Sequence, residues 1–137
     1  MFIEKTDLLS VIDLRELEEV SEGDDTVIDA MLYAAVDEMR AYLSDNYDID
    51  TIFSKTGDDR NKMLVRIAND IAVYHLTAKS VAGQDKEDRR ERYDRDIEWL
   101  KMVSQKTQYT DLDQAIEDDE DAEVNYGSNK KRRNYYD

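Results

Sequence analysis

The sequence predicts an all-α fold, and three observations support this prediction. Residues 26–45, 60–82 and 86–106 each place apolar side chains three or four positions apart, which keeps them on one side of a helix. No segment alternates apolar and polar residues between turn signals, as a half-buried strand would. The chain contains no proline, so nothing of that kind interrupts the three segments. We therefore expect a small bundle of three long helices.

Two short helices are expected before the long ones. Thr6 is the predicted N-cap of a helix over residues 7–12, because a threonine hydroxyl can accept a hydrogen bond from a free amide of the first turn. Asp13 is the predicted cap of a second short helix over residues 14–20, with Glu16 three residues on as in a capping box. Gly23 and the acidic residues around it mark a stop and supply fresh caps.

The first long helix is predicted over residues 26–45, a length of about 30 Å. Its apolar stripe consists of Ile28, Met31, Leu32, Ala35, Met39, Tyr42 and Leu43. It should end near Asn46 and be followed by an apolar-containing connector over residues 48–53. Residues 57–59 then form the predicted turn and cap before the next helix.

The second and third long helices are predicted over residues 60–82 and 86–106. The stripe of the second consists of Leu64, Ile67, Ala68, Ile71, Tyr74, His75 and Ala78, and Gly83 supplies its stop. Asp85 caps the third, whose stripe consists of Tyr93, Ile97, Leu100 and Val103, with Trp99 beside it. Its first half interleaves opposite charges three and four residues apart, which favours an exposed helix.

Charge divides the chain into a helical domain over residues 1–110 and a charged C-terminal arm over residues 111–137. Residues 111–124 hold eight acidic and no basic side chains, and residues 125–137 hold four basic and one acidic. The formal charge of the whole chain is −15, so phosphate backbones and anionic lipid headgroups repel it. General nucleic-acid binding and membrane binding are therefore not expected.

The residues that usually carry chemistry are sparse. The chain has no cysteine, and its single histidine, His75, lies in the most apolar helix, where a packed core residue is the favoured interpretation. Asp111, Asp113 and Glu117 resemble part of a calcium loop but lack its central glycine and the spacing of its bidentate glutamate. We expect neither an enzyme nor a metal or other cofactor.

Three helix motifs together resemble the Mu-like adaptor proteins of tailed phages, which complete the head-to-tail connector. The resemblance covers roughly residues 2–105 and includes the opening over residues 2–8. The motifs are Ala41-Tyr42-Leu43, Ile67-Ala68-Asn69-Asp70-Ile71-Ala72-Val73-Tyr74-His75-Leu76 and Arg92-Tyr93-Asp94-Arg95-Asp96-Ile97-Glu98-Trp99-Leu100. Asn46 replaces the family's arginine, the usual proline after Tyr47 is missing, and residues from 111 onward lie outside the pattern.

This resemblance implies a structural virion protein of the head–tail neck, made in the host cytoplasm. It implies a homo-oligomeric ring, twelvefold, which binds the portal protein and a tail or second connector protein. DNA passes through the channel of such a ring without specific binding, and acidic side chains let a duplex slide. An acidic helical protein that binds another protein, or that mimics DNA in a basic cleft, remains the alternative.

Two sets of side chains are the candidate sites. The channel-facing candidates come from the predicted loops and are Asp48, Asp50, Asp58 and Asp59. The partner-binding candidates come from the arm and are Lys130, Lys131, Arg132, Arg133, Tyr135 and Tyr136. Arginine and tyrosine are enriched at interface hot spots, so the arm is predicted to dock on a neighbouring subunit or on the portal.

Overall fold

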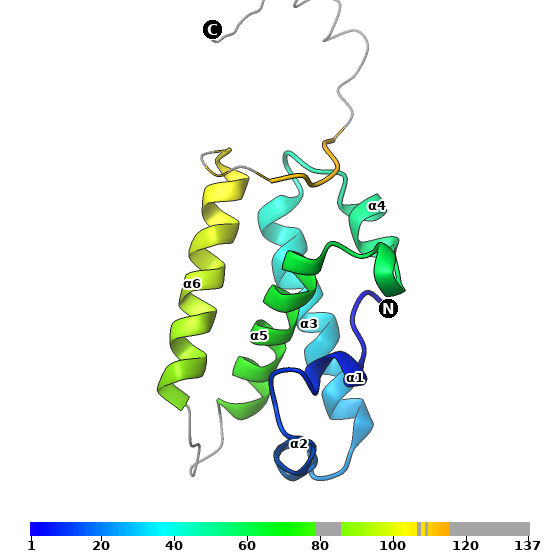
Figure 1. Cartoon of the computed structure of the whole chain (residues 1–137), viewed down its shortest axis with the longest axis vertical. Helices are drawn as coiled ribbons and strands as arrows, with labels where there is room; N and C mark the ends of the chain where they lie inside the picture. The colour runs from blue at the N-terminus through cyan, green and yellow to red at the C-terminus, as the bar shows by residue number, and fades with distance from the viewer. Residues whose placement is uncertain (79–85, 107, 109, 116–137) are drawn as a thin grey trace, which may run out of the picture.

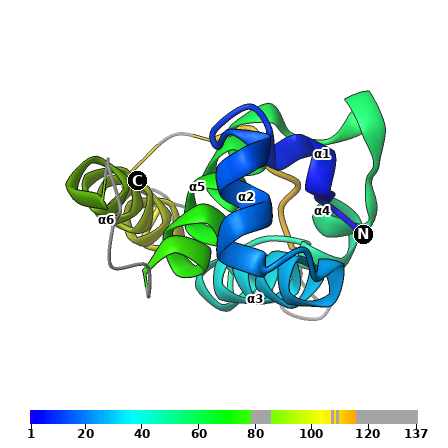
Figure 2. The same ribbon diagram turned by 90° about the horizontal axis from the view of Figure 1, so that it is seen from below.

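The computed structural model describes residues 1–78, 86–106, 108 and 110–115, and it confirms the all-α prediction. Three long helices, α3 (Asp25–Leu43), α5 (Lys62–Thr77) and α6 (Lys86–Ser104), run side by side (Figure 1). The short helices α1 (Lys5–Leu8) and α2 (Leu14–Ser21) pack against α3 and α5. Seen from below, α6 forms one edge of the molecule, and α1 and the N-terminus lie towards the opposite edge (Figure 2).

The predicted apolar stripes form the core of this bundle. Every stripe residue named for α3 is buried except Met31 and Tyr42, which are half-buried. In α5 and α6 the fully buried positions include Leu64, Ile71 and Leu100. Of the other predicted stripe residues, Tyr74, His75 and Tyr93 are half-buried, and Ala78, the C-cap of α5, is exposed. The faces predicted from the 3.6-residue period are therefore the faces that meet between the three helices.

The starts of α1 and α2 differ from the prediction. Thr6 lies inside α1, and Glu4 is the N-cap, with its backbone N–H donating to Asp7 Oδ2 at 2.8 Å. Asp13 does precede α2, but its side chain makes no capping hydrogen bond. Glu16 instead accepts two hydrogen bonds from the guanidinium of Arg89 on α6, at 2.7 and 2.8 Å. The Glu16 side chain, which a capping box would have turned back to the N-cap, is thus engaged in a long-range ion pair.

The predicted glycine stop after α2 is present, and the left-handed turn that ends the helix comprises two residues. Glu22 is the C-cap and has φ 56°, and Gly23 follows with φ 72°. The Gly23 amide donates to the carbonyl of Glu18 at 2.9 Å, which satisfies one of the last free carbonyls of the helix. Asp24 then caps α3 by accepting from the Thr26 amide at 2.9 Å.

The connector predicted over residues 48–53 is wrong, because this segment folds as the short helix α4 (Ile49–Ser54). Ile52 and Phe53 are both buried, and the Phe53 ring meets the Phe2 ring edge to face at a centroid distance of 4.9 Å. A helix of six residues spans less than two turns, so its sequence is too short to show a helical period.

The start of α5 is also shifted from the prediction. Residues 57–59 form a turn as expected, the short 3-10 helix η1 (Gly57–Asp59), but the cap of α5 is Asn61, whose Oδ1 accepts from the Leu64 amide at 3.0 Å. Arg60 is extended and donates to the Phe2 carbonyl at 3.0 Å and to Asp7 Oδ2 at 2.8 Å. This cation ties the N-terminus to the start of α5.

The later boundaries of the long helices are partly outside the described residues. α5 is described to Thr77, so the predicted end at residue 82 and the Gly83 stop lie in the segment 79–85, as does the Asp85 cap. α6 ends at Ser104, two residues before the predicted end. Residues 110–115, just beyond the predicted domain boundary, lie against the helical domain, and Leu112 is buried there.

Candidate functional site

The first pair of channel-facing candidates lies at the start of α4. Asp48 is the N-cap of this helix and accepts from the hydroxyl of Thr51 at 2.7 Å and from its amide at 3.3 Å. These hydrogen bonds from Thr51 lower the pKa of Asp48, because they stabilise its charged form. Asp50 is exposed and forms an ion pair with Arg40 of α3 at 3.1 Å. Asp48 therefore has a structural role in addition to its charge.

The second pair lies in η1, which follows α4 in the chain. Asp58 and Asp59 are both exposed, and neither forms an ion pair among the described residues. The nearby guanidinium of Arg60 is held by Asp7 instead. Of the four candidates, these two carboxylates have the fewest contacts that stabilise the fold.

Residues 111 and 113, which sequence reasoning placed in the arm, join the same side of the molecule. Lys55 Nζ lies 3.1 Å from Asp113 Oδ2, and Asn61 Nδ2 donates to Asp111 Oδ1 at 3.2 Å. The backbone of this segment also pairs with the chain that precedes α4, since the Asp48 amide donates to the Asp113 carbonyl at 2.8 Å. The buried side chain of Leu112 fastens the segment between these polar contacts.

We call this side of the molecule the acidic edge. Its members are the aspartates of the segments around α4 and of the C-terminal segment, Asp48, Asp50, Asp58, Asp59, Asp111 and Asp113. Three of them, Asp59, Asp111 and Asp113, line a depression of about 220 Å³, together with Lys55 and Leu112. Chemically, such an edge repels phosphate groups and attracts cations.

The acidic edge is not arranged as a metal centre. Asp111 and Asp113, two of the three residues that resemble a calcium loop, bond to Asn61 and Lys55, and the third, Glu117, lies outside the described residues. Among residues 1–78, 86–106, 108 and 110–115, no group of three or more histidine, aspartate or glutamate side chains converges on a point that could hold a metal ion.

The single histidine belongs to a polar and aromatic cluster that links all three long helices. Glu38 of α3 lies 3.1 Å from His75 Nε2 and accepts from the Tyr93 hydroxyl at 2.6 Å. The ring of Tyr93 stacks on Tyr74 at a centroid distance of 4.2 Å. Burial raises the pKa of Tyr93, and the hydrogen bond to the Glu38 carboxylate raises it further, so the phenol stays protonated and donating.

Replacement of His75 by glutamine is expected to leave the fold intact and to lower the free energy of unfolding by about 0.5–1.5 kcal/mol, the worth of an edge-to-face aromatic contact. The half-buried His75 side chain loses its ring contacts in this variant, but the glutamine amide can still donate to Glu38. Urea unfolding followed by circular dichroism measures the change. Complete loss of a biological activity in a normally folded His75→Gln protein would contradict the packing role.

A second polar pair, to which sequence reasoning gave no role, is buried between α5 and α6. Asp70 is 6% exposed and Asp96 is 1% exposed. Arg66 Nη1 lies 3.3 Å from Asp70 Oδ2 and 3.4 Å from Asp96 Oδ1, and Arg95 Nε lies 3.7 Å from Asp96 Oδ1, while Asp96 Oδ2 is buried without a donor among the described residues. Burial, followed by the hydrogen bond and charge of Asp70, raises the pKa of Asp96 to about 7.

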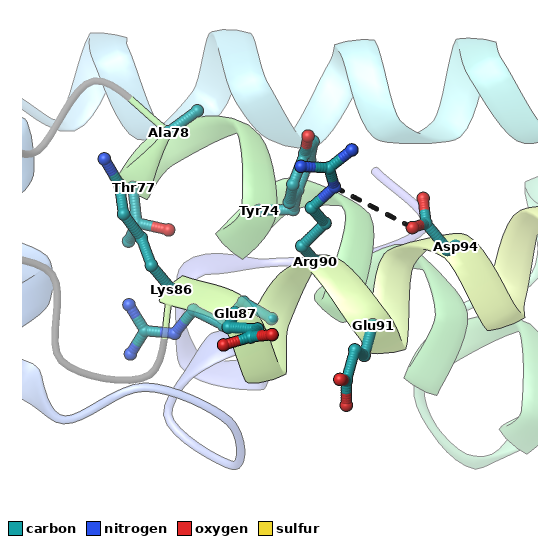
Figure 3. Close-up of a pocket in the computed structure, with 9 residues that line it drawn as sticks. Tyr74, Thr77, Ala78, Lys86, Glu87, Arg90, Glu91 and Asp94 are labelled. Atoms are coloured by element: carbon teal, nitrogen blue, oxygen red, sulfur yellow. Dashed lines mark ion pairs between the residues drawn. The ribbon is translucent and has the colours of Figure 1, made fainter.

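A pocket of about 590 Å³ lies where α5 ends and α6 begins (Figure 3). Charges of both signs line it: Lys86 and Arg90 stand beside Glu87 and Asp94. The Arg90 Nε lies 3.9 Å from Asp94 Oδ2, and both side chains are mostly exposed. Since neither sign of charge dominates, the lining gives no preference for an anionic or a cationic ligand.

The six partner-binding candidates of the arm, residues 130–133, 135 and 136, lie outside the described residues. The channel-facing candidates, in contrast, are all described: Asp59 shares a depression with Asp111 and Asp113, and the Asp48 amide bonds to the Asp113 carbonyl. No helix in the described part of the chain has the length and apolar character needed to cross a membrane.

Comparison with known proteins identifies the family. The family model described as Bacteriophage Mu, Gp36 matches residues 2–126, so the shared sequence extends beyond residue 105, where the resemblance was predicted to end. The comparisons with curated proteins and with solved structures found no match. Because the family match spans most of the chain, the protein belongs to the bacteriophage Mu Gp36 family and is a phage structural or morphogenesis protein.

Proposed function

We propose that this protein is a head-to-tail connector adaptor that forms a ring beneath the portal, in the neck of the virion, with the acidic edge turned towards the DNA channel. The acidic edge is the observation that supports this orientation most directly. A backbone hydrogen bond joins Asp48 to Asp113, and Asp59, Asp111 and Asp113 line one depression, so aspartates of two separated segments lie close together. Membership of a phage Mu family supports the setting.

The ring geometry explains why one acidic edge is useful. In a closed ring of identical subunits the same edge of every copy faces the axis, so its charges are repeated around the channel. Carboxylates at the wall repel the phosphates of a duplex, whereas a lysine-rich wall would exchange counterions with the DNA and retain it. The proposed partners are the portal on one side of the ring, a tail or second connector protein on the other, and further copies of the chain.

The assembly itself is tested by mixing the full chain with purified rings of the phage's own portal protein. Analytical ultracentrifugation should show the chain sedimenting with the portal, at a fixed stoichiometry that defines the copy number. Failure to bind the portal at physiological salt, together with tight binding to a basic nucleic-acid-binding protein, would contradict the connector and favour a DNA mimic.

Charge reversal on the acidic edge tests the orientation. Asp58 and Asp59 are the suitable pair, because Asp48 caps α4 and Asp50 pairs with Arg40. Particles that carry Asp58→Lys with Asp59→Lys are expected to eject DNA more slowly than the parent. The difference should be larger at low salt, since a Debye length of about 30 Å at 0.01 M falls to about 3 Å at 1 M.

The matched control reverses the same amount of charge on α6, at the other edge of the bundle. Glu87→Lys with Glu91→Lys changes two exposed carboxylates there and should leave the rate of ejection at the parent value. Equal rates of ejection from parent and Asp58/Asp59 particles at every salt concentration would exclude these residues from the channel wall.

A further inference from the structure

The outward face of α3 carries an acidic stripe that no other described element covers. Its members follow one another at intervals of four residues, so they lie on one line along the helix: Asp25, Asp29, Tyr33 and Asp37. All four are exposed, and Tyr33, at 58% exposed, is the most exposed large hydrophobic side chain described. We call this face the α3 stripe.

Two of the three carboxylates of the stripe have no partner of opposite charge in the described part of the chain. Asp25 forms an ion pair with Lys5 at 3.0 Å, but within the described ranges Asp29 and Asp37 have no cationic partner. The neighbouring exposed residues Ala30 and Ala34 are small, so the Tyr33 ring stands above a shallow surface and can be approached from its face. An aromatic ring between carboxylates suits a cationic, arginine-containing peptide.

We infer that the basic end of the arm, residues 130–136, binds the α3 stripe of its own chain. This segment holds Lys130-Lys131-Arg132-Arg133 followed by Asn134 and two tyrosines. Four consecutive extended residues span about 10 Å, and Asp29 lies about 12 Å from Asp37 along the helix axis. The cations therefore match the two unpaired carboxylates in length as well as in charge, and an arginine plane can stack on Tyr33 between them.

The structure also fixes where the arm begins. The amide of Ala115 donates to the carbonyl of Asn46 at 3.1 Å, three residues after the last residue of α3. Along the axis, Asp37 lies about 9 Å and Asp29 about 21 Å before that end of the helix. The fourteen residues from 116 to 129 can reach at most about 46–50 Å when fully extended, so this length of chain is enough to bridge the distance.

The tether favours the chain's own stripe over that of a second copy. A linker whose span matches the distance between two sites gives an effective concentration in the millimolar range, well above the micromolar concentration of free protein. The family match ends at residue 126, so the basic segment lies beyond the shared sequence. A binding surface for the basic segment on this same chain requires no other member of the family and no portal. The inference therefore does not rest on the connector proposal.

Paired cysteines test the contact, and the chain offers a clean background because it has none of its own. The test variant combines Ala34→Cys with Asn134→Cys, and the matched control combines Glu98→Cys, on the exposed side of α6, with the same Asn134→Cys. Oxidation of dilute full-length protein is followed by mass spectrometry, after each thiol's own reactivity has been measured. We expect the intramolecular disulfide to form at least about tenfold faster in the test variant than in the control at low salt.

Two changes should remove this advantage. Salt at about 1 M shortens the Debye length to about 3 Å and should bring the two rates within about twofold of each other. Asp29→Lys with Asp37→Lys should do the same, and adding Lys131→Glu with Arg133→Glu to that background should restore the faster rate. Circular dichroism checks that each variant keeps its helix content.

Two results would overturn the inference. Equal rates in the Ala34 and Glu98 variants at low salt would show that the arm has no preference for α3. Disulfide-linked dimers that form faster than the intramolecular product in dilute protein would show that the arm binds the stripe of a second copy instead.

Discussion

Replacement of Ile71 by alanine is expected to lower the free energy of unfolding by about 2–5 kcal/mol, the range found when a large buried aliphatic side chain is truncated. Ile71 is fully buried near the middle of α5, the helix that packs against both α3 and α6. The alanine variant loses the transfer free energy of the removed methyl and methylene groups, and it leaves a cavity that the surrounding helices fill only in part. Urea unfolding at constant protein concentration measures the loss.

Two variants calibrate this experiment. Leu64→Ala removes a second fully buried side chain, near the start of α5, and should lower the free energy of unfolding by a similar amount. Met63→Ala is the matched control, because Met63 directly precedes Leu64 in the same helix but is 40% exposed. This variant should change the free energy of unfolding by no more than about 0.5 kcal/mol. Losses below about 0.5 kcal/mol at both buried sites would contradict the assignment of the helix faces.

The three long helices were predictable because each repeats its apolar stripe over several turns. Ile28, Leu32 and Leu43, for example, are all buried, as their spacing requires. The short helix α4 was missed because six residues do not establish a period. Its stability depends on where Ile52 and Phe53 pack, and Phe53 meets Phe2, a residue from the far end of the chain.

Helix caps were predicted less well than helix interiors, because several polar residues near each start can serve as the cap. At α5 the prediction chose Gly57-Asp58-Asp59, whereas the structure uses Asn61. The choice is decided by Arg60, which is held in an extended conformation by Asp7 and by the Phe2 carbonyl. Contacts of this kind join residues more than fifty positions apart and leave no local signal.

The candidate site shows the same division between local and long-range information. The sequence marks Asp48, Asp50, Asp58 and Asp59 as exposed acidic residues near helix ends, and each lies near such an end. That Asp111 and Asp113 lie on the same edge depends on the pairing of two distant backbone segments. The buried apolar side chain of Leu112, within an otherwise polar run, is the one signal that could have indicated this.

The buried pair of Asp70 and Asp96 makes the stability of the protein depend on pH near neutrality. Asp96 keeps its proton in the folded state until its pKa of about 7, whereas in the unfolded chain an aspartate releases its proton near 3.8. The contribution of this proton to the free energy of unfolding is therefore full below about pH 4 and is lost as the pH rises through about 7. We expect the free energy of unfolding to fall by about 1–3 kcal/mol between pH 5 and pH 8.5.

Replacement of Asp96 by asparagine should remove most of this decrease. The asparagine amide can donate to Asp70 in place of the lost proton, and no second charge has to be held at a site that is 1% exposed in the parent. At pH 8.5 the variant should therefore be more stable than the parent, by about 1–3 kcal/mol, and at pH 5 the two should be close. Urea unfolding at both pH values measures the four free energies.

The pKa values of Asp7 and Glu16 are shifted in the opposite direction. Burial alone would raise the pKa of Asp7, but the hydrogen bonds from Arg60 and the Glu4 amide, together with the charge of Arg60, lower it. For Glu16 the hydrogen bond from Arg89 is the main cause of a lowered pKa. The stability that these two carboxylates supply is lost only when the pH falls below about 4, outside the measured window. Asp94→Asn, on the exposed side of α6, is the matched control and should keep the pH dependence of the parent. If Asp96→Asn also kept the pH dependence of the parent, the titration of the Asp70–Asp96 pair would not be the cause of that dependence.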